Sequence, residues 1–255
     1  MPVCLPTMKY QTDVKPINYS VPAILLLVAV QSLAAVGESV QLPGDLYLEA
    51  AERGIPVYKV DARASRVDIL VFKGGKLARF GHDHVISTTD INGLVCLPEN
   101  FVNGRADLIV SLATLEVDRE VLRNEYGMDT KMSESAKKGT RRNMLDKVLE
   151  ATEWPTVAIQ ATVAKPDLHA PVLNISFTLH GINRNFELPV SMRVIGEQLH
   201  VKGAFALRQT DYGVEPYSTL AGGLRVLDGV EIHFDIVARR HNFDTAQLPQ
   251  GTAHE

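Results

Sequence analysis

Two histidines separated by one residue, His82 and His84, form the clearest chemical motif of this sequence. If the segment is a β-strand, both imidazoles project from one face, near enough to share a divalent transition metal or to grip an anionic group. Two ligands do not complete a zinc site, which needs about four, or three and a water. The motif therefore predicts a contact with the polar head of a ligand, or a metal site completed by His180, His233 or Glu231.

A metal at this position would support a hydrolase or a redox protein, with Asp83 or Glu231 as the base. The sequence contains no nucleophile elbow, Walker loop, dinucleotide fingerprint or HExxH motif. Catalytic triads need no sequence signature, so this lowers the expectation of an enzyme without removing it. Most single histidines only form hydrogen bonds. We therefore expect a binding protein without catalysis and keep the metal-dependent enzyme as the alternative.

A basic run, KKGTRR, lies beside the apolar positions of a predicted helix. Its side chains could meet a pyrophosphate or an anionic membrane surface in a transient contact, although charged helix faces are most often only solvated. A second polar pair, Arg208 and Asp211, is expected to set the turn before Gly213. The candidate head-group or metal contacts are His82, His84, Arg141 and Arg142.

The composition is that of an ordinary globular domain, with 45% hydrophobic and 22% charged residues. The net charge of −4 gives no global positive field, so nucleic-acid binding is not expected. Cys96, between two apolar residues, is expected to be a buried small hydrophobe. Cys4 precedes the apolar segment described next, so a mature chain would keep one thiol and form no internal disulfide.

Residues 21–30 read VPAILLLVAV, with lysines before them and small residues after them. The apolar run is shorter than the ~20 residues of a spanning helix, so it predicts a signal peptide over residues 1–34, cleaved near Ala34. An uncleaved anchor is the alternative. The stretch before the run is long for a leader, so translation could start at Met1 or at Met8.

Most of the remaining chain alternates apolar and polar residues with the period of two that is typical of strands. The runs NISFTLHG and EIHFDIVAR show it, and Gly203 within HVKGAFALR predicts a bend or a bulge. The run RVDILVF is apolar on both faces, so both sides of its strand must be covered. KLARFGHDHVIS also reads as a strand. Roughly ten strands with short connections favour a sandwich or a barrel.

Two segments depart from this pattern. Residues 43–54 predict a short amphipathic helix that stops at Gly54. Residues between Asp118 and Trp154 are polar and helix-prone, with Ser133 as a helix cap. An insertion of this length in an all-β domain is typical of a lid, and Trp154-Pro155 forces the chain into the next strand.

Five motifs together resemble the YceI-like family of lipocalin-like proteins: YKVDARASRVDI, RRNMLDKVLEATEWPTVAI, FTLHGINRNFELPV, GAFALRQTDYGV and DGVEIHFDIVAR. The resemblance covers about Val57 to Arg240. It implies an all-β fold, an extended antiparallel lipocalin-like β-barrel of about eight strands with a helical insertion. It also implies a periplasmic protein that carries a long-chain isoprenoid lipid, as a pyrophosphate or a quinone. Ala64 stands where the family usually has a histidine, and many members lack the His-x-His motif.

The expected domains are the signal peptide (1–34), an N-terminal helix and linker (35–54), the barrel (55–241) and a C-terminal tail (242–255). An apolar interior could be a filled core that leaves function to the loops, or a tunnel for a lipid. The resemblance favours the tunnel, while the oligomeric state stays open. The predicted lipid contacts are Ile69, Val71, Phe72, Phe80, Ile175, Phe177, Leu179, Phe186, Phe205, Ile232 and Phe234.

Overall fold

The computed structural model describes residues 41–128, 130–167, 170–219 and 221–243. The predicted signal peptide and most of the predicted C-terminal tail lie outside these residues. The described residues all belong to one compact unit, Val36–Glu255. None of the helices in this part of the chain is both long and apolar enough to span a membrane.

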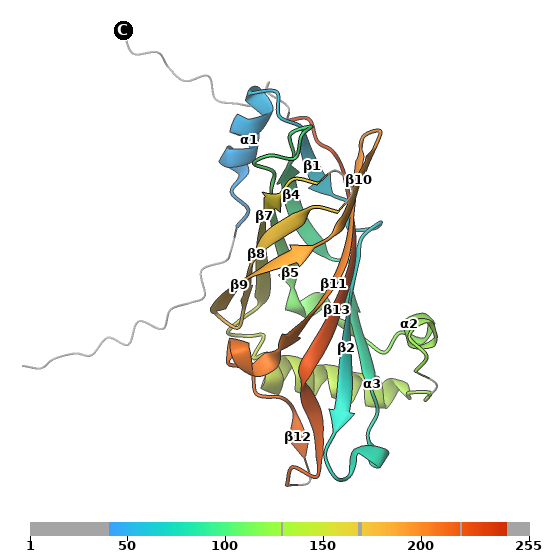
Figure 1. Cartoon of the computed structure of the whole chain (residues 1–255). Helices are drawn as coiled ribbons and strands as arrows, with labels where there is room; N and C mark the ends of the chain where they lie inside the picture. Colours follow the sequence, from blue (N-terminus) through green and yellow to red (C-terminus); the bar gives the residue numbers. More distant parts are fainter. Residues whose placement is uncertain (1–40, 129, 168–169, 220, 244–255) are drawn as a thin grey trace, which may run out of the picture. The chain divides into compact units, whose positions relative to one another are not determined.

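The described residues form a single antiparallel sheet of thirteen strands, with a few helices around it (Figure 1). This confirms the all-β class. The strands are β1 (Val57–Val60), β2 (Arg66–Gly74), β3 (His84–Thr88), β4 (Ile91–Cys96), β5 (Arg105–Ser111), β6 (Glu116–Val117), β7 (Thr156–Lys165), β8 (Val172–Leu179), β9 (Ile182–Pro189), β10 (Ser191–Ile195), β11 (Gln198–Arg208), β12 (Ser218–Thr219) and β13 (Leu224–Arg240). The helices are α1 (Gly44–Glu52), α2 (Glu120–Glu125), α3 (Glu134–Asn143), the π-helix η3 (Met144–Val148) and the 3-10 turns η1 (Ala78–Phe80), η2 (Leu112–Thr114) and η4 (Gln209–Tyr212).

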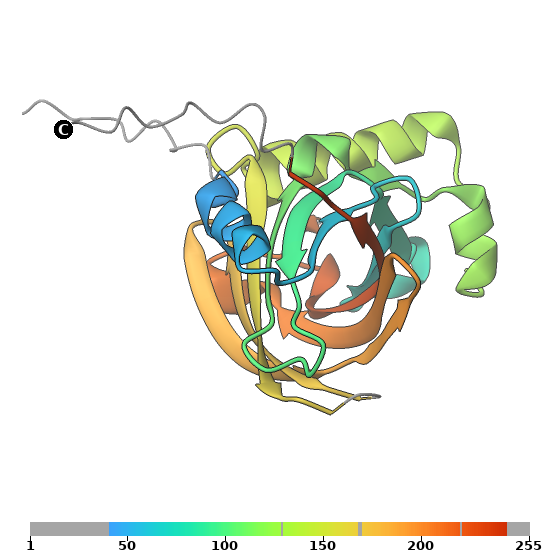
Figure 2. The ribbon, with the colours of Figure 1, turned by 90° about the horizontal axis from the view of Figure 1, so that it is seen from above.

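Strand β13, the last and longest of the described strands, pairs with strands from both the first and the last part of the domain. One of its edges pairs with β11, and its other edge pairs first with β2 and then with β1. From β1 the sheet continues through β4, β5, β7 and β8 to β9. Seen from above, the strands curve around a common interior (Figure 2). This is the predicted extended barrel.

Thirteen strands exceed the predicted number of about eight because several strands are interrupted. β1 and β2 follow one another along the same edge of β13, β3 runs into β4, and β9 runs into β10. If each of these pairs is counted once, and the two-residue strands β6 and β12 are set aside, eight strands remain. The interruptions let one strand pair with different neighbours along its length, since β9 pairs with β8 and β10 pairs with β11.

The hydrogen-bonded path is not a closed ring, because it ends at β6 on one side and at β9 on the other. Aromatic packing fills the space between β9 and β11, where the rings of Phe186 and Phe205 lie 5.2 Å apart. At the other end of the path, the guanidinium of Arg141 on α3 donates to the carbonyl oxygens of Ala113 and Leu115, which lie between β5 and β6. Side chains and a helix thus complete the wall that backbone pairing leaves open.

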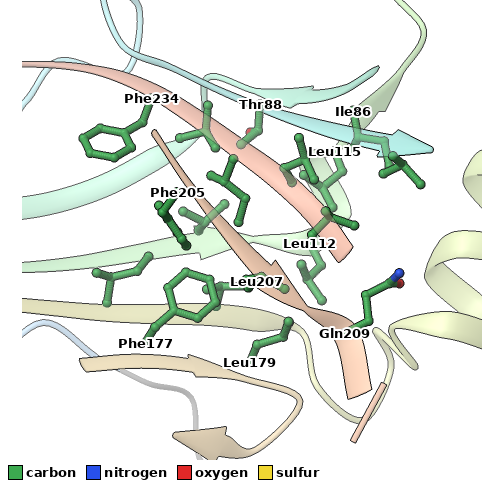
Figure 3. Close-up of a pocket in the computed structure, with 18 of the residues that line it drawn as sticks. Ile86, Thr88, Leu112, Leu115, Phe177, Leu179, Phe205, Leu207, Gln209 and Phe234 are labelled. Carbon is green, nitrogen blue, oxygen red and sulfur yellow. The ribbon is translucent and has the colours of Figure 1, made fainter. Parts of the chain in front are cut away.

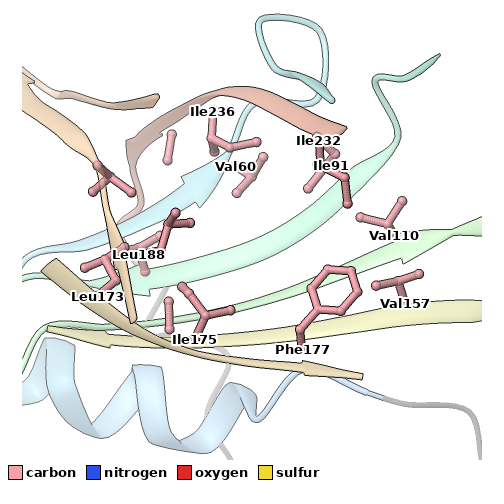
Figure 4. Packing of buried hydrophobic residues seen from close by; sticks show 14 of the residues in the cluster. Val60, Ile91, Val110, Val157, Leu173, Ile175, Phe177, Leu188, Ile232 and Ile236 are labelled. Atoms are coloured by element: carbon pink, nitrogen blue, oxygen red, sulfur yellow. The ribbon is translucent and has the colours of Figure 1, made fainter. Parts of the chain in front are cut away.

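The alternation of the strands places one apolar set inside and a second set outside. Ile175, Phe177 and Ile232 belong to the inner cluster (Figure 4), and β2 contributes inward residues as well. On the outer face of β2, Leu70 packs with Val85 and with Leu122 of α2. The prediction that both sides of this strand are covered is therefore confirmed.

The predicted N-terminal helix is α1, and Gly54 after it has a φ of 77°. It packs outside β1 and β4 over Cys96, which is buried as expected. The bulge predicted at Gly203 is wrong, since β11 pairs with β13 without a register shift. A Cβ at Gly203 would lie 2.6 Å from the Phe234 ring, so the glycine leaves room for that ring.

The predicted helical insertion contains α2 and α3. The hydroxyl of Ser133 accepts a hydrogen bond from the amide of Ala136, as predicted for a helix cap. After Asn143 the helix continues as the π-helix η3. The turn before Gly213 differs from the prediction, because Arg208 donates to Asp228 at 2.9 Å instead of pairing with Asp211.

Candidate ligand cavity

A cavity of about 410 Å³ lies inside the barrel (Figure 3). Its wall is made almost entirely of aliphatic and aromatic side chains, with Phe177, Phe205 and Phe234 along one stretch. Pockets of about 300–1,000 Å³ with mostly apolar walls are typical of small-molecule sites. The interior is therefore hollow in part, and the filled-core alternative is wrong for this region.

Burial varies along the barrel and shows where the cavity is open. At the end near β10, the inward side chains Leu188, Met192 and Leu199 are buried. Farther along, inward side chains such as Ile69 and Leu207 are only partly buried, although they face the interior. The cavity wall extends to these three buried residues, and its side chains are more exposed toward the end formed by β2, β12 and β13.

Several polar residues of the wall lie near that open end. Lys73 and Arg225 lie on adjacent strands, in the pairs Val226↔Lys73 and Arg225↔Gly74, and His82 lies close by after η1. None of the described lining residues carries a carboxylate, and the basic ones are Lys73, His82, His84, Arg105 and Arg225. The guanidinium of Arg105 is already paired with Asp107 at 2.7 Å. This wall therefore favours a ligand with a neutral chain and an anionic or uncharged head.

His84 belongs to a buried polar network behind the cavity wall. Its Nδ1 lies 2.7 Å from Oδ2 of Asp118, a residue with no exposed surface. The Arg123 guanidinium donates to Oδ1 of the same carboxylate at 2.7 Å, and the amide of Val85 donates to it at 3.2 Å. Burial tends to raise the pKa of Asp118, but these hydrogen bonds outweigh it and hold the pKa below its ordinary value. The network fixes the ring of His84 at the wall.

The two histidines of the motif do not share one strand face, so that prediction is wrong. The segment before His84 forms η1 and a bend, and the strand begins only at His84. The chain turns because Gly75, with a φ of 91°, packs against the carbonyl oxygen of Gly223, where a Cβ would lie at 2.5 Å. In the described part of the chain, no group of three or more His, Cys, Asp or Glu side chains could hold a metal ion. Among the described residues there is therefore no third ligand for the predicted metal site.

The predicted basic head-group contacts on α3 lie away from the cavity wall. Arg141 is held by two backbone carbonyls, as described above, and Arg142 is exposed. The same segment does reach the cavity through Asn143, Met144 and Leu149. The sequence predicted a lid with an apolar helix face that contains Met144, but it predicted no contact of these residues with the cavity. Leu149 continues the apolar pattern, whereas Asn143 is polar and gave no such signal.

Nine of the eleven predicted lipid contacts line the cavity. Phe186 packs on Phe205 at the wall but is not among the lining residues. Phe80 is 61% exposed and lies outside, with the guanidinium of Arg79 4.6 Å from its ring. Whether the lining residues touch a lipid stays a prediction. The nine are Ile69, Val71, Phe72, Ile175, Phe177, Leu179, Phe205, Ile232 and Phe234.

Comparison with known proteins agrees with this architecture. The family model described as the YceI-like domain matches residues 58–238. The chain belongs to the YceI-like family. Among curated proteins, none matches the sequence.

Three solved structures are compared with this YceI-like domain, and the first resembles it in fold. BcnA of Burkholderia cenocepacia is 14% identical with a TM-score of 0.50, over 70% of this chain and 98% of its own. A polyisoprenoid binding domain from Saccharophagus degradans is also 14% identical, with a TM-score of 0.47, over 72% of this chain and 98% of its own. The YceI protein of Campylobacter jejuni is 10% identical, with a TM-score of 0.43, over 60% of this chain and 82% of its own.

Proposed function

We propose that this protein binds a polyisoprenoid lipid, of the isoprenoid quinone or prenyl pyrophosphate type, and holds it inside the barrel for transport or storage. The observation that carries the proposal is the hollow apolar interior of about 410 Å³ in a member of the YceI-like family. Each methylene removed from water contributes about 0.8 kcal/mol, so a prenyl chain would bind firmly even after the cost of ordering it.

The head of such a lipid belongs at the open end. A pyrophosphate there would meet Lys73, His82 and Arg225, and a quinone oxygen could accept hydrogen bonds from the same groups. His84 lies farther in, fixed by Asp118. No bond-making step is needed for this function, and a protein without catalysis remains our expectation.

Location is the second part of the proposal. The apolar run at residues 21–30 supports export to the periplasm with removal of a leader near Ala34. The intact mass of the protein purified from its native cells tests this directly. The mass expected for a chain that begins at Ala35 supports the proposal. The mass of a chain that still contains residues 1–34 contradicts cleavage.

Extraction of the purified protein with organic solvent, followed by mass spectrometry, tests lipid binding. We expect a prenyl lipid at a stoichiometry approaching one per chain. The variant Leu207→Trp places an indole in the cavity and should remove the lipid. Ala206→Trp, one residue away on the outer face of β11, is the matched control and should keep it. Circular dichroism checks that both variants fold, and equal lipid in both would contradict the proposed site.

A further inference from the structure

The open end of the barrel carries exposed apolar and basic side chains together. We call this end the tip and define it as residues 73–82 and 221–227. Phe80 is 61% exposed and Leu227 is 41% exposed. Lys76, Arg79 and Arg225 are exposed beside them. Large apolar side chains that project into water at the entrance of a cavity point to a contact with another apolar phase.

The two segments of the tip form one surface. The amide of Leu77 donates to the carbonyl of Gly223 at 2.7 Å, and Lys73 pairs with Val226 across β2 and β13. Lys73, Gly81, His82, Leu224, Arg225 and Val226 also line the cavity. The exposed surface of the tip is therefore continuous with the entrance of the cavity. The strands β2, β12 and β13 of this end are at the lower end of Figure 1.

The charge of the tip is uniformly positive. Residues 73–82 and 221–227 contain four lysines and arginines and no aspartate or glutamate. The acidic residues that follow each segment are engaged, since Asp83 accepts the amide of Lys73 and Asp228 accepts from Arg208 and Thr210. In the described part of the chain, no carboxylate forms an ion pair with Lys76, Arg79 or Arg225. These cations are available to an external anion although the whole chain has a net charge of −4.

We propose that the tip docks on the surface of a lipid bilayer that contains anionic lipids, so that the cavity opens onto the membrane. Basic residues would contact the head groups while Phe80 and Leu227 enter the interface. This inference rests on the proposed function. A water-insoluble lipid must pass from a membrane into the cavity, and docking would serve that transfer. Helix α3 is a poorer surface for this contact, since Arg141 is bound to carbonyls and Lys137 to Glu134.

Vesicle flotation with the full chain tests the docking. The probes are vesicles of phosphatidylcholine alone and vesicles with one third phosphatidylglycerol, each in low and high salt. We expect binding to the anionic vesicles that weakens with salt. The double variant Arg79→Ala/Phe80→Ser should bind at least about fivefold more weakly, the effect expected from the loss of one surface charge alone.

The opposite end of the barrel offers a matched control. Ile195 is also 61% exposed, and Arg193 lies two residues before it on β10. Arg193→Ala/Ile195→Ser removes the same kinds of groups and should leave vesicle binding unchanged. Residues 1–40 are the same in every variant, so differences among variants report on the tip. Equal binding by wild type and the tip variant, or equal losses in both variants, would overturn the proposal.

Lipid extraction from the same samples separates this inference from the proposed function. Wild-type protein that carries prenyl lipid but does not bind anionic vesicles overturns the docking and leaves the function intact. Tip-dependent vesicle binding by a protein that never contains lipid supports the docking surface and overturns the proposed function.

Discussion

Asp118 is the residue on which the polar network behind the cavity depends. It has a φ of 57°, in the left-handed region that non-glycine residues rarely occupy, and it pairs with the buried Arg123. Removal of one partner from a buried ion pair leaves an uncompensated charge. The backbone conformation, the ion pair and His84 therefore depend on one another.

We expect Asp118→Asn to lower the free energy of unfolding by about 3 kcal/mol at neutral pH, because Arg123 loses its buried counter-charge. Urea denaturation measures this. Glu49→Gln, at the exposed pair with Arg53, is the control and should change stability by less than about 1 kcal/mol. A loss no greater than that of the control would show that the buried pair contributes little.

The effect of Asp118→Asn on the free energy of unfolding should depend on pH. The pKa of Asp118 is lower in the folded state, so its contribution is present above the unfolded value of about 3.9 and is lost as pH falls through the folded pKa. The stability difference between wild type and Asp118→Asn should therefore shrink as pH falls from 6 to 3. A difference that grows over this range would contradict the lowered pKa.

Sequence reasoning identified the inward apolar residues but not this network. Successive side chains of a strand point to opposite faces of the sheet. The alternation of apolar and polar residues therefore predicts that Ile175, Phe177 and Ile232 point inward. Asp118, the partner of His84, and Arg123, the partner of Asp118, lie 34 and 39 positions farther along the chain than His84. No local pattern predicts which side chains a barrel brings together. Phe80 was misplaced because the glycines around η1 turn a segment that alternates like a strand.

The turn between β8 and β9 shows how an element depends on its connecting residues. His180 and Gly181 both have positive φ angles, 52° and 72°, and they join the paired residues Leu179 and Ile182. Two positive φ angles in a two-residue hairpin match the right-handed twist of the strands. A Cβ at Gly181 would also lie 2.5 Å from the Trp154 ring.

Glycine-to-alanine substitutions in two elements should have opposite effects on stability. Gly181→Ala should destabilise the protein by about 1–3 kcal/mol, because of its φ angle and its contact with Trp154. Gly139→Ala, inside α3 with open space around it, should stabilise it by about 0.5–1 kcal/mol. Thermal unfolding of both variants tests this pair, and a shift of the same sign in both would contradict it.

The domain as a whole should gain stability from its ligand. A lipid that binds only the folded state adds stability that grows with its concentration, by about 2.7 kcal/mol at a hundred times the dissociation constant. We therefore expect extracted protein to unfold at a lower temperature and to recover when a long-chain prenol is added. Leu207→Trp should show no recovery, while Ala206→Trp should recover like wild type.

The prediction of an all-β barrel succeeded because alternation and the family motifs extend over nearly the whole domain. The strand count was less accurate, because interruptions such as Val190 between β9 and β10 depend on which neighbour each half pairs with. The size of the cavity also could not be read from apolar content, since Leu188 and Leu207 look alike in sequence. Both line the cavity, but Leu188 is buried whereas Leu207 is only partly buried.

Because β13 pairs with β1, β2 and β11 and is the last of the described strands, the barrel cannot close until residues 224–240 have been synthesised. A ribosome-bound fragment that ends before residue 224 lacks the strand that pairs with one edge of β1 and of β2. That edge of each strand stays unpaired and prone to aggregation. We therefore expect nascent chains to stay open until β13 has been synthesised. In the export that we propose, this delay would keep the polypeptide in the unfolded form that a translocation channel accepts.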